Sequence, residues 1–473
     1  MGKYFGTDGF RGEANVVLTA DHAYRIGRFL GWYCREHDLS LPADQTIPAH
    51  RPRVVLGKDT RRSSYMFEYA IAAGLTASGA DPYMLHVTTT PSVSFVTARE
   101  DFDVGIMISA SHNPYMDNGI KLVNRHGEKI DDDAIRVIEA YLDGGAAALG
   151  LSEEEMWNHD LPLASGADVG RIIDYAAGRN RYVGYLISLA SNSYKGYRVG
   201  LDCSNGSAWM IGRAVFEALG AKTYVTGAEP DGLNINVECG STHIDRLRAL
   251  VLEKELDVGF AFDGDADRCI AVDEEGREIN GDHILYVLGK AMKEQGALNN
   301  NTVVTTVMSN MGLYRALDKA GIDYVQTTVG DRFVYENMVQ NDHSVGGEQS
   351  GHVILRKYAT TGDGLLTAIM LMERIVDSKL SLGKLAAPVV MYPQVTRNLR
   401  VPDKDAVMNH PTVLQKLEDC NTRLGNGGRM LLRKSGTEPV IRVMVEAADA
   451  ETCNAYVQEM VDLITAEGLT LNA

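Results

Sequence analysis

Short runs of consecutive apolar residues alternate along most of the chain with longer stretches in which apolar residues recur at helical spacing. The runs that predict buried strands include residues 51–59, 104–108, 197–205 and 258–265, and several more between 302 and 355. Ile244, Leu247 and Val251 illustrate the helical spacing, since they fall on one face of a helix. Strands separated by helices indicate parallel or mixed sheets covered on both faces, so we expect an α/β protein.

The C-terminal part of the chain follows a different pattern. After Pro393 we expect a strand, a helix, a hairpin and a final helix, the first three at 395–401, 411–424 and 429–447. This order indicates a small α+β module. At 473 residues the chain is too long for one core, and the usual domain size predicts roughly three domains. The expected borders lie at 144–165, near Cys269 and at 385–393.

The composition excludes several classes of protein. The chain has 45% hydrophobic and 23% charged residues, as an ordinary globular protein does. Its six cysteines form no CxxC pair, so we expect no disulfide framework, no zinc site, and the reducing cytoplasm as compartment. The N-terminal residues contain no apolar signal core, and no run approaches about 18 apolar residues, so we expect no membrane association. A net charge of −17 disfavours nucleic acid as a partner.

The segment GIMISASHNP at 105–114 holds the first candidate for chemistry. The strand predicted at 104–108 ends abruptly in small and polar residues, and Pro114 cannot continue a strand ladder. This places the hydroxyl of Ser111 at the end of a rigid strand, where α/β proteins tend to hold reacting groups. Ser109 is expected to be structural. A serine hydroxyl alone is a poor nucleophile, so Ser111 needs an activating group.

A serine hydrolase that uses Ser111 and His112 is one alternative for this segment. Adjacent residues at a strand end cannot easily present both side chains to each other. The GxSxG elbow of many such enzymes is also missing from the sequence. We therefore expect the activating group of Ser111 to come from elsewhere in the chain.

Three aspartates in the segment DGDADR form the second candidate. Asp263, Asp265 and Asp267 stand at alternate positions directly after the strand predicted at 258–262. Three carboxylates at this spacing can surround one hard cation at a strand end. The pattern favours magnesium, with a solvated acidic turn as the alternative.

An EF-hand calcium loop is a rival interpretation of the same segment. The three aspartates match its first, third and fifth positions, and Glu274 matches its twelfth. However, Arg268 stands at the sixth position, where the turn of an EF-hand requires glycine. The flanking residues are also strand-like rather than helical, which favours magnesium over calcium.

Two further loops indicate binding of a phosphorylated sugar. The segment RKSGTEPVIR combines backbone N–H groups and hydroxyls with basic side chains, which suits a phosphate dianion. Its expected contacts are Arg433, Ser435, Gly436, Thr437 and Arg442. In GGEQSGHV, Glu348 and Ser350 fall on one side of an extended loop and could bind sugar hydroxyls or, for Glu348, an amine. An ordinary hairpin turn and a solvated loop are the respective alternatives.

Basic residues gather at a few motifs of this acidic chain. GTDGFRG at 6–12 and GKDTRRSS at 57–64 contribute several of them. The set that we expect to line an anion-binding pocket is Arg11, Lys58, Arg61, His112, Lys121, Arg268 and His352. Turn glycines with solvated charges are the alternative for the two N-terminal motifs.

Taken in order, these motifs resemble those of the α-D-phosphohexomutase superfamily. The matching motifs are GTDGFRG, GKDTR, SASHNP, NGIK, DGDADR, VGDR, GEQSGH and RKSGTEPVIR, which cover nearly the whole chain. GEQSGH and the segment DGLNINVECGSTH at 231–243 resemble the branch that acts on glucosamine phosphates. The chain departs modestly from the family pattern: 40–51 and 145–163 look longer, and Ala266 stands where glycine is frequent, which should not alter the ligands.

The resemblance implies a fold of three related α/β domains with mixed sheets and a smaller C-terminal α+β domain around a central cleft. Each domain would contribute one loop to that cleft. The expected domains are 1–165 with the phosphoserine loop, 166–268 with the metal loop, 269–388 with the sugar-binding loop and 389–473 with the phosphate-binding loop.

The resemblance also implies an intramolecular phosphotransferase that interconverts glucosamine 6-phosphate and glucosamine 1-phosphate. Ser111 would carry the phosphoryl group, and glucosamine 1,6-bisphosphate would be both intermediate and activator. The product would feed amino-sugar nucleotide and cell-wall precursor synthesis. One Mg²⁺ per chain is expected on Ser111 and the three aspartates, where it would neutralise charge on the transferring group.

The remaining site residues have expected roles in the same reaction. Arg268 and Lys121 would stabilise the transferring phosphoryl group. Lys121, His112 and Arg11 stay open as the general acid or base, because sequence spacing cannot rank them. The sugar itself is expected to contact Glu348, Ser350 and His352.

Alternatives and partners complete the expectations from the sequence. A phosphomannomutase or phosphoglucomutase is the nearest alternative function, and a non-catalytic sugar-phosphate sensor is a more distant one. The expected partners are small sugar phosphates, with no nucleic acid and no membrane. The sequence does not give the oligomeric state, which leaves a homodimer open.

Overall fold

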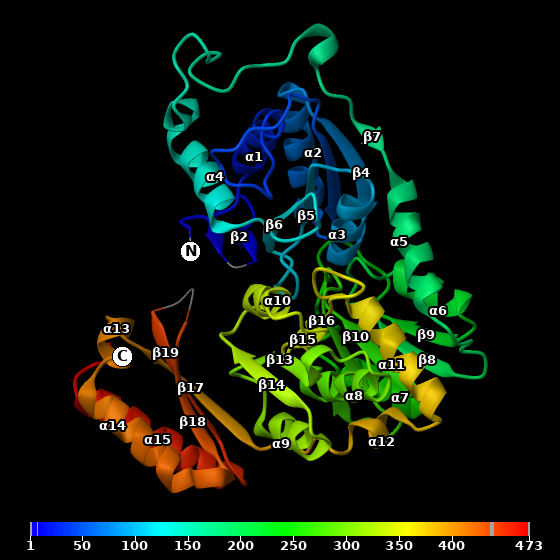
Figure 1. Cartoon of the computed structure of the whole chain (residues 1–473), viewed down its shortest axis with the longest axis vertical. Coiled ribbons are helices and arrows are strands. Elements are labelled where there is room, and N and C mark those ends of the chain that lie inside the picture. The colour runs from blue at the N-terminus through cyan, green and yellow to red at the C-terminus, as the bar shows by residue number, and fades with distance from the viewer. Residues whose placement is uncertain (1, 7, 436–438, 472–473) are drawn as a thin grey trace. The chain divides into compact units, whose positions relative to one another are not determined.

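The computed structural model describes residues 2–6, 8–435 and 439–471. Their contacts form two compact units, one of Met1–Met308 with Ile322–Ala387 and one of Ser309–Gly321 with Pro388–Ala473. The larger unit contains three mixed sheets with helices, and the smaller unit contains one antiparallel sheet (Figure 1). The predicted fold class, α/β domains with a smaller C-terminal α+β domain, is confirmed.

The first sheet has seven strands in the order β1-β2-β6-β5-β3-β4-β7. They are β1 (Phe5–Gly6), β2 (Gly9–Glu13), β3 (Arg53–Lys58), β4 (Asp81–Val87), β5 (Val104–Ile108), β6 (Asp117–Asn124) and β7 (Ile173–Asp174). Strand β3 is parallel to β4 and β5, whereas β6 is antiparallel to β5 and β2. The accompanying helices are α1 (Ala20–Tyr33), α2 (Arg62–Ala77), α3 (Thr90–Arg99) and α4 (Asp132–Gly144).

Alternation along β3 explains why the first sheet is covered on both faces. Val54 and Leu56 belong to the same hydrophobic cluster as Ile26 of α1. Val55, which lies between them, belongs to a second cluster with Val93 of α3. Since successive side chains of a strand point to opposite faces, the two clusters lie on opposite sides of the sheet. The uninterrupted apolar run in the sequence therefore corresponds to a strand buried on both faces.

The second and third sheets also mix parallel and antiparallel pairs. The second, in the order β12-β11-β10-β8-β9, consists of β8 (Arg198–Asp202), β9 (Lys222–Thr226), β10 (Val258–Phe262), β11 (Cys269–Val272) and β12 (Glu278–Ile279). The third, in the order β14-β13-β15-β16, consists of β13 (Thr302–Thr306), β14 (Asp323–Thr327), β15 (Val345–Gly347) and β16 (Val353–Leu355). The remaining helices of the larger unit are α5 (Ala176–Leu189), α6 (Ile211–Ala218), α7 (Asp245–Glu253), α8 (Gly281–Glu294), α10 (Asp331–Gln340), α11 (Gly364–Ser378) and α12 (Leu382–Ala386).

The smaller unit is built on a sheet in the order β17-β19-β18. Its strands are β17 (Gln394–Arg400), β18 (Arg429–Lys434) and β19 (Val440–Glu446). Its helices are α9 (Met311–Ala320), α13 (Lys404–Met408), α14 (Pro411–Leu424) and α15 (Ala450–Ala466). Short 3₁₀ helices in the chain lie at Ala146–Leu149, Gly166–Asp168, Asn299–Asn301 and Gly425–Gly427. Helix α14 has the bounds expected from the sequence.

Strand pairing shifts two of the expected domain borders. The border at 268/269 falls between β10 and β11, which pair as an antiparallel hairpin, so the second sheet continues to Ile279. The border at 165/166 precedes β7, which pairs with β4 of the first sheet. In addition, α9 belongs to the smaller unit although it lies within the range expected for the third domain. The sequence marks borders by changes in composition, whereas hydrogen-bonded pairing decides which strands share a core.

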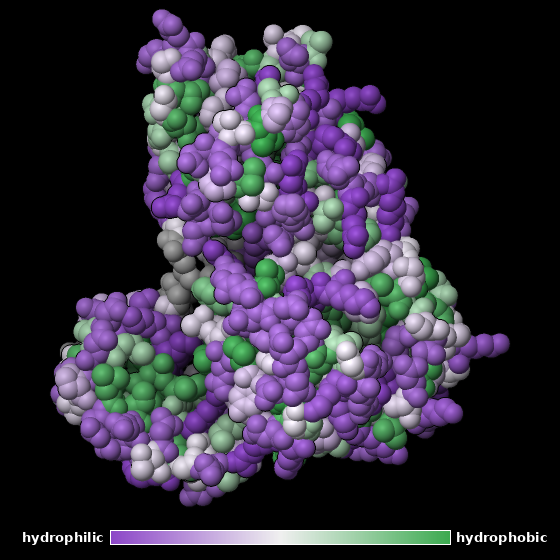
Figure 2. All heavy atoms as spheres, in the orientation of Figure 1, coloured by the Kyte–Doolittle hydropathy of each residue, from purple (hydrophilic) through white to green (hydrophobic). Residues whose placement is uncertain are grey.

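The cysteines and the surface agree with the composition. All six cysteines are free and buried. Among the described residues, every helix is too short or too polar to cross a membrane. The face drawn in Figure 2 is mostly hydrophilic, and its hydrophobic side chains form separate groups. Such a face fits a chain with a net charge of −17.

Candidate active site

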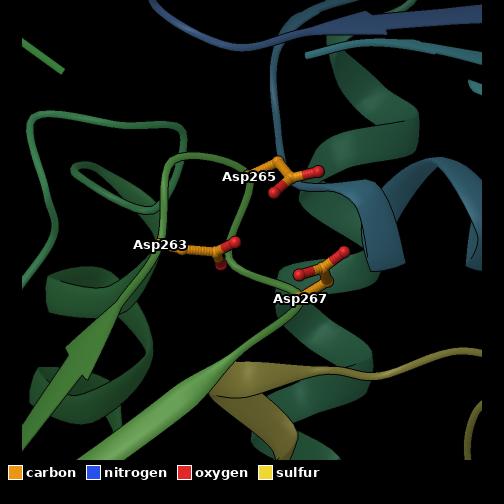
Figure 3. A group of neighbouring side chains, drawn as sticks. All are labelled: Asp263, Asp265 and Asp267. Atoms are coloured by element: carbon orange, nitrogen blue, oxygen red, sulfur yellow. The ribbon is translucent and has the colours of Figure 1, made fainter. Parts of the chain in front are cut away.

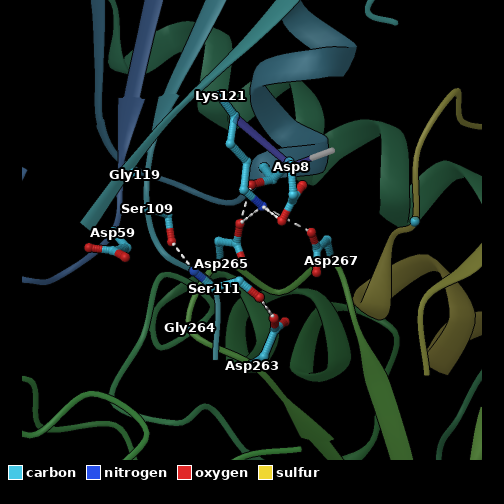
Figure 4. A network of polar contacts seen from close by, with 12 residues as sticks. Asp8, Asp59, Ser109, Ser111, Gly119, Lys121, Asp263, Gly264, Asp265 and Asp267 are labelled. Atoms are coloured by element: carbon cyan, nitrogen blue, oxygen red, sulfur yellow. Dashed lines mark hydrogen bonds and ion pairs between the residues drawn. The ribbon is translucent and has the colours of Figure 1, made fainter. Parts of the chain in front are cut away.

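The serine loop, residues 109–114, follows the fully buried strand β5. Ser111 is 1% exposed and adopts a left-handed backbone conformation with φ of 53°. Its N–H donates to Oγ of Ser109 over 2.9 Å, and its own Oγ donates to a carboxylate oxygen of Asp263 (Figure 4). Ser109 therefore shapes the loop, while the Ser111 hydroxyl points to the acidic segment of the second sheet.

The metal loop, residues 263–268, connects β10 to β11. Carboxylate oxygens of Asp263, Asp265 and Asp267 lie within 4.8 Å of one another, and Figure 3 shows the three side chains converging. The Oδ1 atoms of Asp265 and Asp267 are buried and accept no hydrogen bond from the described residues. A hard divalent cation is held by oxygen atoms that do not already accept hydrogen bonds. Since two such oxygens are present, the three aspartates fit a metal ion.

The surroundings of the metal loop exclude two alternatives. Strands β10 and β11 form an antiparallel hairpin, whereas an EF-hand holds its loop between two helices. The three aspartates are at most 4% exposed, which also excludes a solvated acidic turn. The EF-hand and acidic-turn interpretations of the sequence are therefore wrong for this loop.

Burial and mutual repulsion perturb the acidic cluster. Burial, together with the charges of Asp267 and Asp265, raises the pKa of Asp263 well above its ordinary value. Burial also raises the pKa of Asp267, but the Lys121 ammonium and His352 outweigh burial and hold that pKa well below its usual range. Burial and the neighbouring carboxylates thus disfavour the charged form of Asp263, a condition that a divalent cation would relieve.

Lys121 of β6 is the central cation of the site (Figure 4). Its Nζ lies 2.7 Å from Asp265, 3.2 Å from Asp267 and 3.5 Å from Asp8. Burial lowers the pKa of this ammonium, but the three carboxylates outweigh burial and raise the pKa above its ordinary value. Lys121 therefore stays protonated. Arg11 of β2 pairs with Asp8, which brings a second cation to the same cluster.

His112 lies closer to Ser111 than the sequence predicts. Its Nδ1 is 3.3 Å from Ser111 Oγ, so the expectation that these adjacent side chains cannot face each other is wrong. That expectation assumes that neighbouring side chains point to opposite sides, as they do in a strand. Ser111 is left-handed rather than extended, so the rule does not apply here. Burial and the charges of Arg268 and Arg11 lower the pKa of His112 to about 4, so its imidazole is neutral at neutral pH.

Arg268 ends the metal loop beside the turn that holds Glu348. Its backbone N–H donates to Oδ1 of Asp263 over 3.1 Å. Burial lowers the pKa of its guanidinium, but Asp263, Asp267 and Glu348 outweigh burial and raise it. The side chain is thus a permanent positive charge between the metal loop and the third sheet.

The predicted sugar-binding residues occupy a tight turn between β15 and β16 rather than an extended loop. The N–H of Glu348 donates to the carbonyl oxygen of His352 over 3.0 Å, and the antiparallel strands close the turn. Ser350 is exposed, whereas Nδ1 of the buried His352 lies 3.7 Å from Asp267. Burial lowers the pKa of His352, but Asp331 and Asp267 outweigh burial and raise it to about 9. The turn thus brings His352 to the acidic cluster.

Two of the predicted cations are paired with buried carboxylates. Lys58 is 2% exposed and forms an ion pair with Glu68. Arg61 is fully buried and forms an ion pair with Asp59. The expectation that these two side chains line an anion pocket is wrong, because a buried carboxylate already neutralises each of them.

The predicted phosphate loop belongs to the smaller unit. Arg433 of β18 stands opposite Arg442 of β19 in the antiparallel register, so the two side chains share one face of the hairpin. The N–H of Ser435 donates to the carbonyl oxygen of Val440 over 3.0 Å where the hairpin narrows. Gly436 and Thr437 lie outside the described residues. The hairpin therefore places two of the predicted arginines together on one face.

The sequence analysis missed two residues that contact the acidic cluster. Asp8 stands in the motif GTDGFRG, three residues before Arg11, and this spacing could have suggested its pairing with a cation of the site. Thr90 begins α3 and donates through Oγ1 to Oδ2 of Asp265 over 2.5 Å. Its N–H also donates to the carbonyl oxygen of the same aspartate over 3.0 Å. Nothing in the local sequence of Thr90 signals this contact.

Sequence models of four domains of one family match the chain. They describe phosphoglucomutase/phosphomannomutase alpha/beta/alpha domains I, II and III and the C-terminal domain. The matched residues are 2–148, 180–276, 280–392 and 397–463, respectively. The matches cover most of the chain and follow the order of the four groups of elements described above.

Individual proteins agree with this assignment. A phosphoglucosamine mutase of Lachnospira eligens is 58% identical over 468 residues, which are 99% of each chain. A phosphoglucomutase/phosphomannomutase family protein from Burkholderia thailandensis shares the fold, with a TM-score of 0.78, 22% identity and coverage of 100% of this chain and 99% of the other. An Aspergillus fumigatus N-acetylphosphoglucosamine mutase, solved with GlcNAc-6P and magnesium, shares it with a TM-score of 0.68, 16% identity and coverage of 98% and 96%. The resemblance seen in the motifs is confirmed: the chain belongs to the phosphoglucosamine mutase branch of the phosphoglucomutase/phosphomannomutase family and is a phosphohexose mutase.

Proposed function

We propose that the chain interconverts glucosamine 6-phosphate and glucosamine 1-phosphate through a phosphoryl group carried by Ser111. The observation that carries this proposal is the hydrogen bond from Ser111 Oγ to Asp263, which directs the hydroxyl into the acidic cluster beside Lys121. A phosphoryl group on that oxygen would meet the charges needed to neutralise it. The identity of 58% to a phosphoglucosamine mutase supports the choice of sugar.

The acidic cluster would hold one Mg²⁺ per chain through Asp263, Asp265 and Asp267, with Ser111 as a further ligand. The two carboxylate oxygens without hydrogen bonds from the described residues support this assignment. When bound, magnesium neutralises charge on a transferring phosphoryl group. The related A. fumigatus enzyme contains magnesium, which supports this ion over other divalent cations.

The reaction consists of two phosphoryl transfers. In the first, the bond between phosphorus and Ser111 Oγ breaks while phosphorus bonds to the C1 oxygen of glucosamine 6-phosphate. The sugar hydroxyl loses its proton, Ser111 Oγ gains one, and glucosamine 1,6-bisphosphate results. The bisphosphate then turns round, the bond between phosphorus and O6 breaks while that phosphorus bonds to Ser111 Oγ, and the proton lost by the serine hydroxyl is balanced by the one that O6 takes up. Glucosamine 1-phosphate leaves, and the enzyme is phosphorylated again.

The charged side chains near Ser111 would have different roles in phosphoryl transfer. Lys121 stays protonated among its three carboxylates, which suits a fixed charge on the equatorial phosphoryl oxygens rather than a base. Arg11 and Arg268 add charge of the same sign. His112 lies 3.3 Å from Ser111 Oγ, so its position favours it as the proton acceptor, whereas its pKa of about 4 makes it a weak base in the absence of substrate.

Substrate binding would fall to the two loops assigned to the sugar and to its distal phosphate. Glu348, Ser350 and His352 would contact the sugar. The phosphate would bind at Arg433, Ser435, Gly436, Thr437 and Arg442. Arginine suits that task because its planar fork forms paired, charge-assisted hydrogen bonds with phosphate oxygens.

Phosphopeptide mapping tests the phosphoserine. After incubation with glucosamine 1,6-bisphosphate and Mg²⁺, the parent enzyme should carry one phosphate on Ser111, and Ser111→Ala should carry none and lose turnover while staying folded. Ser188→Ala is the control, because it removes the hydroxyl of an exposed serine in α5, and it should still acquire phosphate at Ser111. Turnover of Ser111→Ala near the parent value would overturn the covalent scheme.

The choice of sugar is tested by comparing substrates. We expect a higher kcat/KM for glucosamine 6-phosphate than for mannose or glucose phosphates with the same activator and Mg²⁺. A preference for mannose or glucose phosphate would identify a phosphomannomutase or phosphoglucomutase instead.

Two properties of the protein in solution stay predictions. The six buried, free cysteines favour a reducing compartment such as the cytoplasm. A homodimer is tested by the sedimentation velocity of the full chain, and a single species of monomer mass at micromolar concentration would contradict it.

A further inference from the structure

Two motifs of the sequence have no role in the chemistry described so far. GKDTRRSS supplies Arg61, and DGLNINVECGSTH supplies Asn236. Both side chains donate to the same two backbone carbonyl groups, those of Ser111 and Asn113. We propose that Arg61 and Asn236 are positioning residues, which fix the backbone of the serine loop and so aim the Ser111 hydroxyl at Asp263. This inference rests on the proposed function of Ser111 as phosphoryl carrier.

Arg61 holds the loop from the side of the first sheet. Its Nη2 donates to the carbonyl oxygen of Asn113 over 2.6 Å and to that of Ser111 over 3.1 Å. Its Nη1 pairs with Asp59, which also accepts from Oγ of Ser64 over 2.7 Å. The guanidinium is fully buried, neutralised and fixed in direction, so the carbonyl groups meet a rigid donor.

Asn236 donates to the same two carbonyl groups from the part of the larger unit that is built on the second sheet. Its Nδ2 donates to the carbonyl oxygen of Ser111 over 2.9 Å and to that of Asn113 over 3.1 Å. Its own N–H donates to the carbonyl oxygen of Ser204, just after β8 of the second sheet, over 2.8 Å. Because carbonyl oxygens only accept, the amide must present its nitrogen to them. The serine loop is thereby fastened to the part of the chain that carries the metal loop.

The serine loop needs such support because its conformation is unfavourable. A φ of 53° at Ser111 is left-handed, which a residue with a Cβ adopts only when its surroundings hold it there. The metal loop approaches the serine loop closely at Gly264, where a Cβ would lie 2.6 Å from the Ser111 carbonyl oxygen and 3.2 Å from Asn236 Nδ2. Because Gly264 has no side chain, the metal loop can come this close. Arg61 and Asn236 then keep the Ser111 hydroxyl directed at Asp263.

Arg61 and Asn236 donate to the backbone of the serine loop and not to the residues proposed to bind the sugar. Their loss should therefore slow phosphoryl transfer and leave the affinity for substrate nearly unchanged. Displacement of a reacting atom by about 1 Å lowers rates by about 100-fold, which sets the scale of the expected effect. A role in folding alone would change stability without changing kcat.

Substitutions at Asn236 test the inference. Asn236→Asp keeps the shape but removes the donor, and Asn236→Ala removes the amide altogether. Asn234→Asp is the matched control, since Asn234 is half-buried in the same segment and donates to the carbonyl oxygen of Glu229 rather than to the serine loop. We would measure kcat, KM for glucosamine 6-phosphate, thermal stability, and the rate at which Ser111 acquires phosphate from the bisphosphate.

Both Asn236 variants should lose about 10- to 100-fold in kcat and in the rate of Ser111 phosphorylation, with KM within about twofold of the parent. Asn234→Asp should stay within about twofold in both parameters. Arg61→Lys, which keeps a charge beside Asp59 but loses the fork, should match the Asn236 variants. If it does not fold, the Asn236 variants decide.

A kcat of Asn236→Ala equal to that of Asn234→Asp would overturn the inference. So would a loss confined to KM or to thermal stability. Ser111→Ala, assayed alongside, separates this failure from that of the proposed function. If Ser111→Ala is inactive and Asn236→Ala is normal, only the positioning role fails; if Ser111→Ala is active, the phosphoserine itself fails.

Discussion

The serine loop and the metal loop share two backbone features, but they differ in whether their buried polar groups accept hydrogen bonds. Each follows a buried strand, and each contains a non-glycine residue in left-handed conformation, Ser111 with φ of 53° and Ala266 with φ of 57°. In the serine loop, Arg61 and Asn236 satisfy two carbonyl groups with four hydrogen bonds. In the metal loop, two buried carboxylate oxygens accept no hydrogen bond from the described residues.

The difference indicates which loop is complete without a ligand. The buried charge beside the serine loop, Arg61, is balanced by Asp59. The metal loop holds three buried carboxylates, and burial raises the pKa of Asp263, with repulsion from Asp267 and Asp265 adding to the shift. Removal of a carboxylate from the metal loop should therefore alter the response to Mg²⁺, whereas loss of Arg61 or Asn236 should alter turnover without altering that response.

Removing a carboxylate from the metal loop should have the largest effect. Asp263→Asn keeps Oδ1 as acceptor for the Arg268 N–H and places an amide group opposite Ser111 Oγ, and it removes a buried charge and a metal ligand. Turnover should fall at least about 1,000-fold, since stabilisation of the transferring charge is lost. In EDTA the variant should be more stable than the parent, and Mg²⁺ should no longer raise its melting temperature.

The matched control for this variant is Asp245→Asn, which removes the same charge from a side chain that is 92% exposed. Thermal unfolding with EDTA or Mg²⁺, together with steady-state turnover, distinguishes the two variants. An Asp263→Asn protein that is still stabilised by Mg²⁺ as strongly as the parent would contradict the assignment of the metal loop.

The contact between the two loops should be the next most sensitive feature. Gly264→Ala would place a Cβ 2.6 Å from the Ser111 carbonyl oxygen, so one loop must move. We expect a loss of roughly 3 kcal/mol in unfolding free energy together with a loss of at least about 10-fold in kcat. Gly184→Ala in α5, where a Cβ meets open space, is the control and should be neutral or slightly stabilising. A Gly264→Ala enzyme with normal kcat would show that the loops can separate without consequence.

The same two loops show what the sequence can and cannot predict. Ser111 and the three aspartates follow apolar strands directly, so local pattern and chemistry were sufficient to select them. Arg61 was misassigned to an anion pocket, because a sequence does not show that a cation two residues after an aspartate is buried with it. Asn236 was part of a recognised segment, but its contact with the serine loop spans 125 positions and depends on how two domains pack.

The fold, like the site, could be predicted only in part from the sequence. The alternation of apolar runs predicted most strands and helices, including α14 at its observed bounds. It could not predict that β11 continues the second sheet, because antiparallel pairing depends on the tight turn of the metal loop rather than on composition. The nearness of His112 to Ser111 was missed for a related reason, since a left-handed residue carries no signal when it is not glycine or asparagine.

A second buried carboxylate near the metal loop should give a pH dependence of stability. Asp363 accepts from the Leu366 N–H at the start of α11 and from the Tyr182 hydroxyl, and burial raises its pKa from 3.8 to about 6. The folded protein therefore binds a proton more tightly than the unfolded chain, so this residue's contribution to stability falls as pH rises from about 4 to about 6. The full penalty above that window is about 3 kcal/mol.

Asp363→Asn isolates this contribution, because its Oδ1 can still accept from the Leu366 N–H, its Nδ2 can donate to the Tyr182 oxygen, and the amide does not titrate. In EDTA, urea unfolding should show the parent losing up to about 3 kcal/mol relative to the variant between pH 4 and pH 7. Equal pH profiles for the two proteins would mean that Asp363 titrates normally and that its hydrogen bonds offset burial.

The smallest effect should come from the left-handed residue of the metal loop. Ala266 contributes backbone groups, since its N–H donates to the Asp263 carbonyl oxygen and its own carbonyl accepts from Gly364. Ala266→Gly relieves the left-handed strain of about 1–2 kcal/mol, but the added freedom of glycine in the unfolded chain offsets about half of this. Unfolding in urea should show a gain of about 0.5 kcal/mol, with turnover and Mg²⁺ affinity unchanged. Ser111→Gly would leave the same backbone conformation and abolish turnover, because there the side chain reacts. A loss of Mg²⁺ affinity in Ala266→Gly would instead mean that the methyl group at this position helps to hold the three carboxylates together.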